Sequence, residues 1–394
     1  MKKKIAIITG GTYLNRKGFF NAMLNRTKYL IQQGEFDITV FQCITYDSWL
    51  VRKLRHSKKE ERPSRVVVDG VPINLIWRPL TLVDYLLNTK FNKRTIMSDL
   101  LMSKVYKLLK DFDFIEAHTF ECGLVALDAQ RAYGIPFAIT WHGTDIHTNP
   151  FINKYKKTKT IEIIENANAN FFVSDALRQT SEQLTKKGNK YVLYNGRDER
   201  FSIYDEQTRN SLRSHYGAMG KSVVAFAGNF REVKNVLVIP EIYRLINKRF
   251  PNVVFWMLGD GKLRSKVEKL SGGLNVVFWG NQEPEVMPDF MNCVDILILP
   301  SINEGLPLTL VEALASGARC VGSRVGGISE VIGIENTFEL NSPTFVSDFA
   351  DRVVTLLKEP SIKQPLSPVF SWVETGKKET KIIKELLSCG GKNK

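Results

Sequence analysis

The chain has 394 residues, of which 43% are hydrophobic and 24% charged, and its 55 Lys and Arg against 41 Asp and Glu give a formal charge of +14. This composition excludes disordered, collagen-like and disulfide-scaffold proteins, and the length predicts two domains. Residues 1–200 hold 32 basic and 20 acidic residues, or +12, whereas residues 201–394 hold 23 and 21, or +2. The basicity therefore belongs almost entirely to the first half.

The start of the chain and its cysteines set the expected compartment. The apolar run Ile5–Ile8 is too short for a signal peptide, and no apolar run approaches the roughly 18 residues that a membrane-spanning helix needs. We therefore expect a cytoplasmic protein that crosses no membrane. The five cysteines are widely spaced and form no CxxC pair, so we expect reduced thiols, mostly in cores, rather than disulfides or a structural zinc site. They are Cys43, Cys122, Cys293, Cys320 and Cys389.

In chain order, the first half alternates short β-branched or aromatic runs with stretches of helical period. Strands are expected at Lys4–Thr9, Asp37–Cys43, Val66–Val68, Ile73–Trp77, Phe112–His118, Phe137–Trp141, Ala169–Val173 and Tyr191–Tyr194. Helices are expected near 17–32, 93–110, 121–133, 153–168 and 175–187.

The second half begins the alternation again. Strands are expected at Ser222–Ala227, Asn252–Leu258, Asn275–Trp279, Asp295–Leu299 and Arg319–Gly322, with helices near 235–249, 262–270, 285–292, 307–316 and 346–358. This pattern predicts two doubly wound α/β domains in tandem, over residues 1–198 and 199–370. A lysine-rich amphipathic helix at about 371–390 follows a Pro-rich linker, and we expect it to pack back on the first domain.

The most informative stretch runs from Leu299 to Gly317. An apolar strand ends in Pro-Ser, a short loop holds Glu304 and Gly305, and a helix begins with Pro307 near its first position. Backbone N–H groups at this helix start, around Leu306 to Thr309, have no partner inside the helix and favour an anion such as a diphosphate. Glu312 lies eight residues beyond Glu304, and ionised carboxylates accept hydrogen bonds from sugar or ribose hydroxyls. Two Glu at this spacing alone are most often solvated surface or capping residues. Their position among Pro and Gly residues makes a ligand-binding role the stronger interpretation.

Here the sequence resembles the GT-B-fold retaining glycosyltransferases of family 4, whose Glu-x7-Glu motif matches Glu304 and Glu312. Further matches follow in the same order and cover nearly the whole chain, most weakly at about 45–110 and 335–370. They are Gly10-Gly11, Thr140–Asp145, Phe172–Ser174, Asn195–Asp198, Phe226–Asn235, Leu258–Gly261 and Val277–Gly280. The resemblance implies two facing Rossmann-like domains with a cleft between them, the first binding the acceptor and the second a nucleotide-sugar.

The resemblance also implies roles for individual residues. His142, Lys234, Glu304 and Arg231 are the implied catalytic residues. The implied substrate and nucleotide contacts are Gly10, Gly11, Asp145, Asn195, Gly228, Asn229, Gly259, Gly280, Asn281, Gly305, Leu306, Pro307, Leu308 and Glu312. The sequence departs from the family at one point: Asn229 occupies the usual Arg position and Arg231 follows two residues later, so Lys234 is the stronger candidate for the diphosphate.

The implied chemistry needs these residue types. Cleavage of a nucleotide-sugar bond leaves a diphosphate whose charge grows in the transition state, and a fixed cation with helix-start amides lowers that barrier. We therefore expect no metal or other cofactor, and no Asp-x-Asp pair on a suitable loop suggests a metal site. In the implied retaining mechanism the departing phosphate takes the proton of the acceptor hydroxyl, so no protein base is needed.

Basic residues mixed with aromatic and leucine side chains predict an anionic membrane surface as a partner of the first half. The clusters are Trp49–Lys59 with Arg62 and Arg65, then Tyr85–Leu87 with Lys90, Phe91, Lys93 and Arg94, then Lys154, Lys156, Lys157 and Lys159. A solvated basic face is the alternative. No nucleic-acid motif occurs, so we do not expect a nucleic-acid partner.

The sequence thus predicts a retaining, metal-independent glycosyltransferase at the inner face of the cell membrane. It would move a sugar from a nucleotide donor, a UDP-sugar, to a hydroxyl of a lipid-linked or growing glycan. Two alternatives stay open: a sugar-nucleotide epimerase of related fold, which releases free sugar without an acceptor, and a non-catalytic partner subunit. The displaced Arg favours the subunit, whereas the joint presence of Glu304, Glu312, Lys234 and His142 disfavours it.

Overall fold

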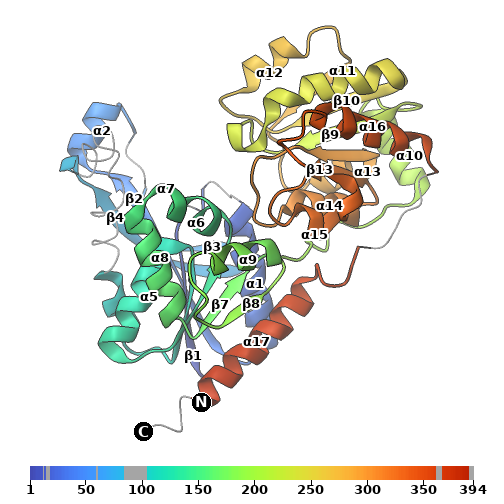
Figure 1. Cartoon of the computed structure of the whole chain (residues 1–394). Coiled ribbons are helices and arrows are strands. Elements are labelled where there is room, and N and C mark those ends of the chain that lie inside the picture. The colour runs from blue at the N-terminus through green and yellow to red at the C-terminus, as the bar shows by residue number, and fades with distance from the viewer. Residues whose placement is uncertain (12, 15–17, 59–60, 84–103, 361–365, 390–394) are drawn as a thin grey trace. The chain divides into compact units, whose positions relative to one another are not determined.

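The computed structural model describes the whole chain except residues 12, 15–17, 59–60, 84–103, 361–365 and 390–394 (Figure 1). It divides into two compact units. Unit 1 comprises Met1–Tyr194 together with Trp372–Lys394, and unit 2 comprises Asn195–Ser371. The division after Tyr194 lies four residues before the predicted boundary at residue 198. Counted by unit, unit 1 holds 36 basic and 21 acidic residues (+15) and unit 2 holds 19 and 20 (−1).

Unit 1 is built on an eight-stranded sheet of order β3-β4-β2-β1-β5-β6-β7-β8. Its strands are β1 (Lys4–Thr9), β2 (Asp37–Asp47), β3 (Arg65–Val68), β4 (Val71–Leu80), β5 (Phe114–His118), β6 (Phe137–Trp141), β7 (Ala169–Phe172) and β8 (Lys190–Val192). All neighbours are parallel except β3 and β4. The carboxyl ends of β1, β2, β4, β5 and β6 therefore lie at one edge of the sheet, where open parallel sheets bind ligands.

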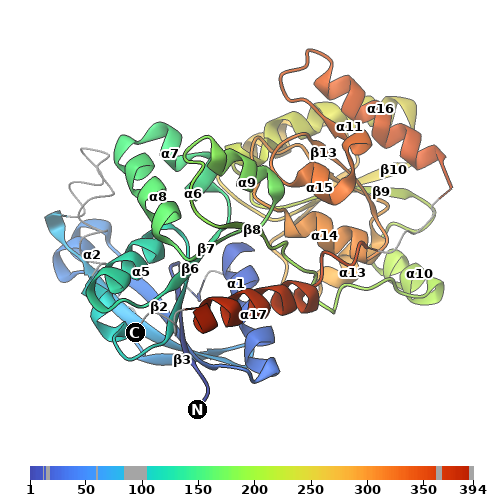
Figure 2. The ribbon, with the colours of Figure 1, turned by 60° about the horizontal axis from the view of Figure 1, so that its bottom comes forward.

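Helices cover this sheet, and one of them comes from the far end of the sequence. They are α1 (Gly18–Gln33), α2 (Trp49–Arg55), the 3₁₀ helix η1 (Lys104–Leu109), α5 (Phe120–Tyr133), α6 (Thr144–His147), α7 (Asn149–Ile152), α8 (Lys154–Asn166), α9 (Asp175–Glu182) and α17 (Trp372–Cys389). Helix α17 lies beside α1 in both ribbon views (Figures 1 and 2), and Ile382 and Ile383 join the core that α1 forms with the sheet. A Cβ on Gly376 would lie 1.9 Å from the Tyr29 ring, so this glycine allows the two helices to approach closely.

Unit 2 holds a fully parallel six-stranded sheet of order β11-β10-β9-β12-β13-β14. Its strands are β9 (Ser222–Ala227), β10 (Val253–Leu258), β11 (Val276–Gly280), β12 (Ile296–Leu299), β13 (Arg319–Ser323) and β14 (Thr337–Phe338). Its α-helices are α10 (Glu206–His215), α11 (Ile239–Arg249), α12 (Arg264–Leu270), α13 (Met287–Cys293), α14 (Leu308–Ala315), α15 (Ile328–Ile332) and α16 (Phe345–Lys358), with the 3₁₀ turns η2 (Glu232–Lys234), η3 (Val236–Val238) and η4 (Ile334–Asn336). Strands β9, β10 and β12 are almost wholly buried, as parallel strands covered on both faces should be.

All thirteen predicted strands are present, and β1, β6 and β9 have the predicted bounds. The predicted ranges did not include β14, α2, α6, α7, α10 or α15, and most of the helix expected at 93–110 lies outside the described residues. Within the described residues, no helix has the length and apolar character needed to cross a membrane. The four cysteines whose side chains are described, Cys43, Cys122, Cys293 and Cys320, are free and buried, as expected.

Candidate active site

Three glycine-bearing loops meet at the carboxyl ends of neighbouring strands in unit 2. Gly228 and Asn229 follow β9, Gly259 follows β10, and Gly280 ends β11. The N–H of Gly228 donates to Leu258 O at 3.0 Å, and the N–H of Gly259 donates to Gly280 O at 2.7 Å. Gly259 has a φ of +114°, and a Cβ there would lie 2.1 Å from Gly228 O. Only glycine fits without moving the backbone, so the predicted nucleotide contacts form one continuous edge of main chain.

The loop after β12 carries an ion pair. Lys234 Nζ donates to Glu304 Oε1 at 2.6 Å, and Ser301 Oγ donates to the same oxygen at 2.7 Å. The two loops are also joined through main chain, because the N–H of Ile302 donates to Val233 O at 2.8 Å. The side chains of Lys234 and Glu304 are 23% and 11% exposed, so the pair is reachable from solvent. No described residue bonds to Glu304 Oε2, which can accept a hydrogen bond from a ligand hydroxyl.

A glycine turn, Gly326-Gly327, packs against the main chain of the Glu304 loop. Gly326 has a φ of +50°, and a Cβ there would lie only 1.9 Å from Glu304 O. The next residue, Gly327, donates its N–H to Gly305 O at 2.9 Å. Ser323 Oγ, at the end of β13, donates to Ser301 O, and the Ser301 hydroxyl in turn donates to the Glu304 carboxylate. The position of Glu304 is therefore fixed by backbone contacts from β13 and the turn after it.

Helix α14 begins directly after this loop. Gly305, Leu306 and Pro307 are buried, Pro307 is the residue that caps the helix, and Leu308 is its first residue. Glu312 lies on the second turn. Burial raises the pKa of Glu312 to about 7, Asp198 adds to the shift and Arg200 opposes it. This carboxyl therefore changes its charge near neutral pH.

Some predicted contacts stay apart from the Lys234–Glu304 pair. Arg231 and Asn229 are exposed, and neither side chain has a described hydrogen bond or ion pair with Lys234 or Glu304. Asn281 is exposed as well. Asn195, the first residue of unit 2, is buried, and its Oδ1 has no hydrogen-bond partner among the described residues. Lys234 is thus the cation that the structure of unit 2 brings to Glu304.

In unit 1, His142 follows β6 and pairs with a second histidine that the sequence had not singled out. His118, the last residue of β5, places its Nδ1 3.1 Å from His142 Nε2, and the two rings stack with centroids 5.4 Å apart. Burial lowers the pKa of His118 to about 3, with Arg26 adding to the shift. Burial likewise holds the pKa of His142 well below its usual range, and His118 and Arg26 contribute. Both imidazoles are therefore neutral at pH 7, with one proton shared in the contact between them.

A buried charged cluster lies behind the histidine pair. Arg26 on α1 donates through Nε to Glu379 Oε2 at 3.1 Å and through Nη1 to Thr140 Oγ1 at 2.9 Å, and its Nη2 contacts both Glu379 Oε1 and Glu116 Oε1, the latter at 3.4 Å. Glu116 Oε1 also lies 3.2 Å from His118 Nε2, although without the alignment of a hydrogen bond. All five side chains are at most 1% exposed.

The protonation of this cluster follows from its burial. Burial raises the pKa of Glu379 to about 8, against the attraction of Arg26 and with the help of Glu116. A cluster of one Arg and two Glu therefore keeps a proton at pH 7 and stays close to neutral, as buried charges require. Glu116 stands in an apolar strand and Glu379 faces a core from an amphipathic helix; an acidic residue at a core position was the only sequence signal that could have found them.

The remaining predicted residues of unit 1 lie around His142. Gly11, after β1, has a φ of +82°, and a Cβ there would lie 2.8 Å from the Phe19 ring, which in turn packs 5.9 Å from the His142 ring. Gly10 lies in the same loop. Asp145 accepts the N–H of Gly143 at 3.0 Å, and burial raises its pKa to about 6. The Oδ2 of Asp145 is buried and has no hydrogen-bond partner among the described residues.

No group of three or more His, Cys, Asp or Glu in the described part of the chain is placed to hold a metal ion.

Comparisons with known proteins identify the family of the chain. Two family models match: "Glycosyltransferase Family 4" over residues 23–201 and "Glycosyl transferases group 1" over residues 221–359. TuaC of Bacillus subtilis (strain 168), a glycosyltransferase assigned to teichuronic acid biosynthesis, is 25% identical over 308 residues, which cover 77% of this chain and 76% of that protein. The Escherichia coli UDP-Gal:alpha-D-GlcNAc-diphosphoundecaprenol alpha-1,3-galactosyltransferase is 25% identical over 249 residues, 57% of this chain and 61% of that protein.

A solved structure shares the fold across both units. The complex of Anabaena Alr3699/HepE with UDP and glucose superposes with a TM-score of 0.72 at 16% identity, covering 97% of this chain and all of that one. The fold is therefore GT-B, as expected, with one Rossmann-like parallel-sheet domain in each unit. The chain is a transferase and belongs to the family 4, group 1 glycosyltransferases.

Proposed function

We propose that the chain is a retaining, metal-independent glycosyltransferase that moves a sugar from a UDP-sugar to a hydroxyl of a lipid-linked or growing cell-surface glycan. The observation that carries the proposal is the Lys234–Glu304–Ser301 group beside the glycine loops of unit 2. UDP as the nucleotide of the donor is supported by the names of the E. coli relative and the HepE complex. The acceptor class is supported by the diphosphoundecaprenol in the E. coli name.

Lys234 can donate hydrogen bonds to the departing diphosphate while it also bonds to Glu304. An ammonium group has three N–H donors, and one of them reaches Glu304 Oε1. The other two can bond to phosphate oxygens, so the charge that develops on the leaving group meets a cation whose position is already fixed. Glu304 then accepts hydrogen bonds from hydroxyls of the donor sugar through Oε2, and Glu312 accepts those of the ribose.

The glycine loops and the start of α14 complete the proposed donor site. Gly228, Gly259 and Gly280 leave main chain uncovered by side chains, which lets a nucleotide approach closely. The backbone N–H groups at the start of α14 favour the negative diphosphate. For unit 1 we propose that His142, neutral and oriented by His118, contacts the transferring sugar, and that Gly10, Gly11 and Asp145 shape the space around it.

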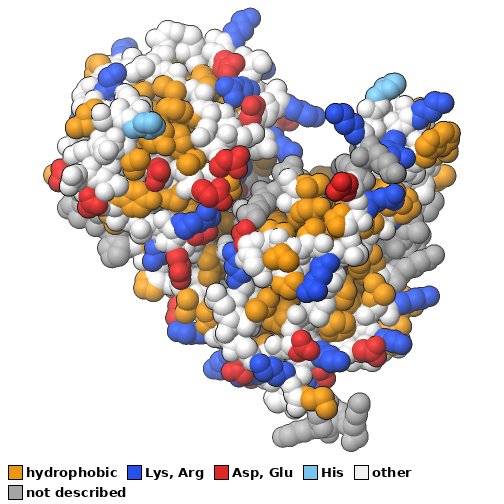
Figure 3. All heavy atoms as spheres, turned by 180° about the vertical axis from the view of Figure 1, so that it is seen from behind, with side chains coloured by type: hydrophobic (Ala, Val, Ile, Leu, Met, Phe, Trp, Pro, Cys, Tyr) orange, Lys and Arg blue, Asp and Glu red, His pale blue; other side chains and the backbone are white. Residues whose placement is uncertain are grey.

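We propose that unit 1 meets an anionic membrane surface from the cytoplasmic side. On the face drawn in Figure 3, Lys and Arg side chains are dispersed among acidic and hydrophobic ones, so net charge alone defines no surface. Helix α2 combines both features needed: Trp49 is 66% exposed, Leu50 47% and Leu54 55%, and Lys53 lies over the Trp49 ring at 5.9 Å. Apolar side chains can enter the headgroup region while the cations meet anionic lipids.

The other basic clusters contribute less to this surface. Lys156 is buried, pairs with Glu121 at 3.0 Å and lies over the Phe120 ring, and Lys159 pairs with Glu162 at 2.7 Å. These two lysines were predicted to belong to the basic surface, and the structure instead gives them partners within unit 1. The cluster that includes Tyr85–Leu87, Lys90, Phe91, Lys93 and Arg94 lies outside the described residues.

The test is transfer of labelled sugar from a panel of nucleotide-sugars to a lipid extract, with and without EDTA. The proposal expects a labelled lipid-linked product from a UDP-sugar, unchanged by EDTA, with the anomeric configuration of the donor. Release of free sugar without any acceptor would instead indicate the epimerase. A thermal-shift screen narrows the donor first, because a ligand at 100 times its dissociation constant stabilises by about 2.7 kcal/mol. Absence of transfer with every donor would favour the non-catalytic subunit.

A further inference from the structure

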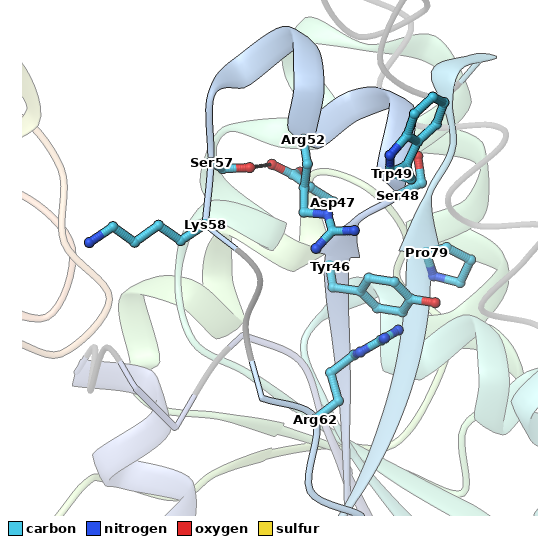
Figure 4. A pocket seen from close by; sticks show the side chains of 9 residues that line it. All are labelled: Tyr46, Asp47, Ser48, Trp49, Arg52, Ser57, Lys58, Arg62 and Pro79. Atoms are coloured by element: carbon cyan, nitrogen blue, oxygen red, sulfur yellow. Dashed lines mark hydrogen bonds between the residues drawn. The ribbon is translucent and has the colours of Figure 1, made fainter.

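A cavity in unit 1 lies beside helix α2, whose Trp49 side chain lines it, and away from His142. It has a volume of 280 Å³ and lies where β2 and β4 end and α2 begins (Figure 4). Tyr46, Trp49 and Pro79 supply its apolar wall, and Arg52, Lys58 and Arg62 supply three cations. The family resemblance is weakest over this part of the sequence, so nothing in the motifs assigns it a role.

Within the described residues, the cations of this cavity have no carboxylate partner. Asp47 is the one carboxylate among the lining residues, and both its oxygens are taken: Oδ1 accepts from Arg55 at 3.0 Å and Oδ2 from Ser57 at 2.8 Å. Among the described residues no carboxylate pairs with Arg52, Lys58 or Arg62. The Nε of Arg52 is buried and has no hydrogen-bond partner in the described structure. Counted over the described residues, the cavity therefore carries uncompensated positive charge, and one of its N–H donors is already withdrawn from water.

Two guanidinium groups are oriented toward the same ring. The Arg62 guanidinium lies over the Tyr46 ring at 4.2 Å, a stacking that holds its planar fork in place. In Figure 4 Arg52 points toward Tyr46 as well, while Lys58 extends away from the group. A fixed guanidinium binds the paired oxygens of a phosphate or carboxylate through two parallel hydrogen bonds. Arg52 and Arg62 thus form the anion-binding part, and Lys58 adds charge at the rim.

The place of the cavity in the sheet sets its distance from His142. β2 continues for five residues beyond Gln42, the partner of Thr9 at the end of β1, and three strand intervals separate β2 from β6. At about 3.3 Å per residue and 4.8 Å per strand interval, the cavity lies on the order of 20 Å from His142. A single sugar ring cannot span that length. An anion in this cavity would therefore belong to a part of the acceptor remote from the reacting hydroxyl.

We propose that this cavity binds a phosphate or diphosphate group of an extended acceptor. The inference rests on the proposed function, because it assigns the reacting hydroxyl to the vicinity of His142. The phosphate can come from two sources with the same chemistry: the headgroup of a lipid-linked saccharide or a soluble phosphorylated glycan.

The test compares two double variants of the full chain with equal loss of charge in unit 1. The cavity pair is Arg52→Gln with Arg62→Gln, and the control pair is Lys107→Gln with Lys110→Gln, whose exposed lysines lie in unit 1 but neither line the cavity nor belong to the proposed membrane surface. Inorganic pyrophosphate is titrated calorimetrically in the presence of saturating UDP, which occupies the donor site. We expect the cavity pair to weaken pyrophosphate binding about tenfold or more, since each lost charged hydrogen bond is worth about that factor, and the control pair to change it by less than twofold.

Equal affinities in the two pairs, or no pyrophosphate binding by the UDP-saturated wild type, would overturn the proposal. UDP titrated alone separates the two claims, because its failure to bind wild type counts against the proposed function and not against the cavity. The single variant Arg62→Gln, at an exposed position, gives the same comparison if the pair unfolds.

Vesicles then identify the source. Neutral phosphatidylcholine vesicles are compared with vesicles that also carry polyprenyl phosphate. Additional binding to the second kind that the cavity pair loses and the control pair keeps assigns the phosphate to a lipid headgroup. Sensitivity of the cavity pair to pyrophosphate alone assigns it to a soluble glycan. An equal loss in both pairs on the vesicles and with pyrophosphate would mean that general surface charge, and not the cavity, binds the anion.

Discussion

The two units place their candidate chemistry in different kinds of surroundings. In unit 2, Lys234 and Glu304 are partly exposed and are held by main chain: glycine loops, the Gly326 turn and the Ser301 hydroxyl. In unit 1, His142 stacks on His118. A cluster of Arg26, Glu116 and Glu379 behind the two rings is shielded from solvent. Unit 2 thus holds a partly exposed cation, whereas unit 1 keeps neutral imidazoles beside buried charge.

Because of this difference, substitutions in the two units should have different effects: loss of transfer in unit 2 and loss of stability in unit 1. Substitution of Lys234 or Glu304 removes a group that faces solvent, so the fold should survive. Substitution within the cluster of unit 1 leaves a charge buried without its partner, so stability should fall first. The predictions below test this contrast, from the largest expected effect to the smallest.

Arg26→Met should destabilise unit 1 by about 3–5 kcal/mol, because it leaves Glu116 and Glu379 buried without their cation. The matched control is Lys3→Met, which breaks an exposed pair with Asp113 and should cost at most about 1 kcal/mol. Urea unfolding of both variants measures the difference. Similar midpoints for the two variants would show that the buried cluster does not hold α17 and α1 to the sheet.

Glu304→Ala and Lys234→Ala should each lower transfer by about 10²–10³-fold, because each removes one group that stabilises the transition state. The unfolding midpoint should move little. Lys266→Ala, at an exposed lysine of α12, controls for loss of charge in unit 2. Initial rates of sugar transfer decide the matter, and rates near wild type in either site variant would remove that residue from the site.

Gly326→Ala should lower transfer about tenfold or more, because its Cβ would displace the main chain at Glu304, and small displacements of a catalytic group are costly. Gly217→Ala is the control. Gly217 has a similar φ of +69° but open space around it, so its substitution should cost only the strain of about 1 kcal/mol in stability. Equal transfer rates in the two variants would contradict the role of the Gly326 turn.

Glu312 should give donor binding a pH dependence of a few fold. Its pKa of about 7 means that the carboxyl is largely protonated at pH 6 and largely ionised at pH 8. The ionised form accepts ribose hydroxyl bonds better, so affinity for UDP-glucose should rise with pH across this interval. Glu312→Gln should flatten the rise, as titrations at pH 6, 7 and 8 can measure. A slope that persists in the variant would have another origin.

The sequence predicted which residues lie together in unit 2 better than in unit 1, because those of unit 2 are close together in the chain. Glu304, Gly305 and Glu312 lie within one strand–loop–helix segment, whose punctuation by Pro and Gly is visible locally. Arg26 and Glu379 are 353 residues apart, and only the packing of α17 against α1 brings them together. Such a pair leaves no local signal.

The same logic explains the errors in the fold. Strands such as β1 and β9 are short runs of buried apolar residues, and their bounds could be predicted. β14 has only two residues, and α2 mixes cations with exposed apolar side chains, so neither shows a clear period. Lys156 and Lys159 were assigned to a basic surface because a sequence does not reveal the partners of a lysine.

The central claim is that unit 2 holds the nucleotide diphosphate on Lys234. The most direct measurement is a calorimetric titration of the full chain with UDP, comparing wild type, Lys234→Ala and Lys266→Ala. We predict similar UDP affinity in wild type and Lys266→Ala, and an affinity about tenfold or more weaker in Lys234→Ala. Equal affinity in all three proteins, or no binding of UDP by any of them, would contradict the account.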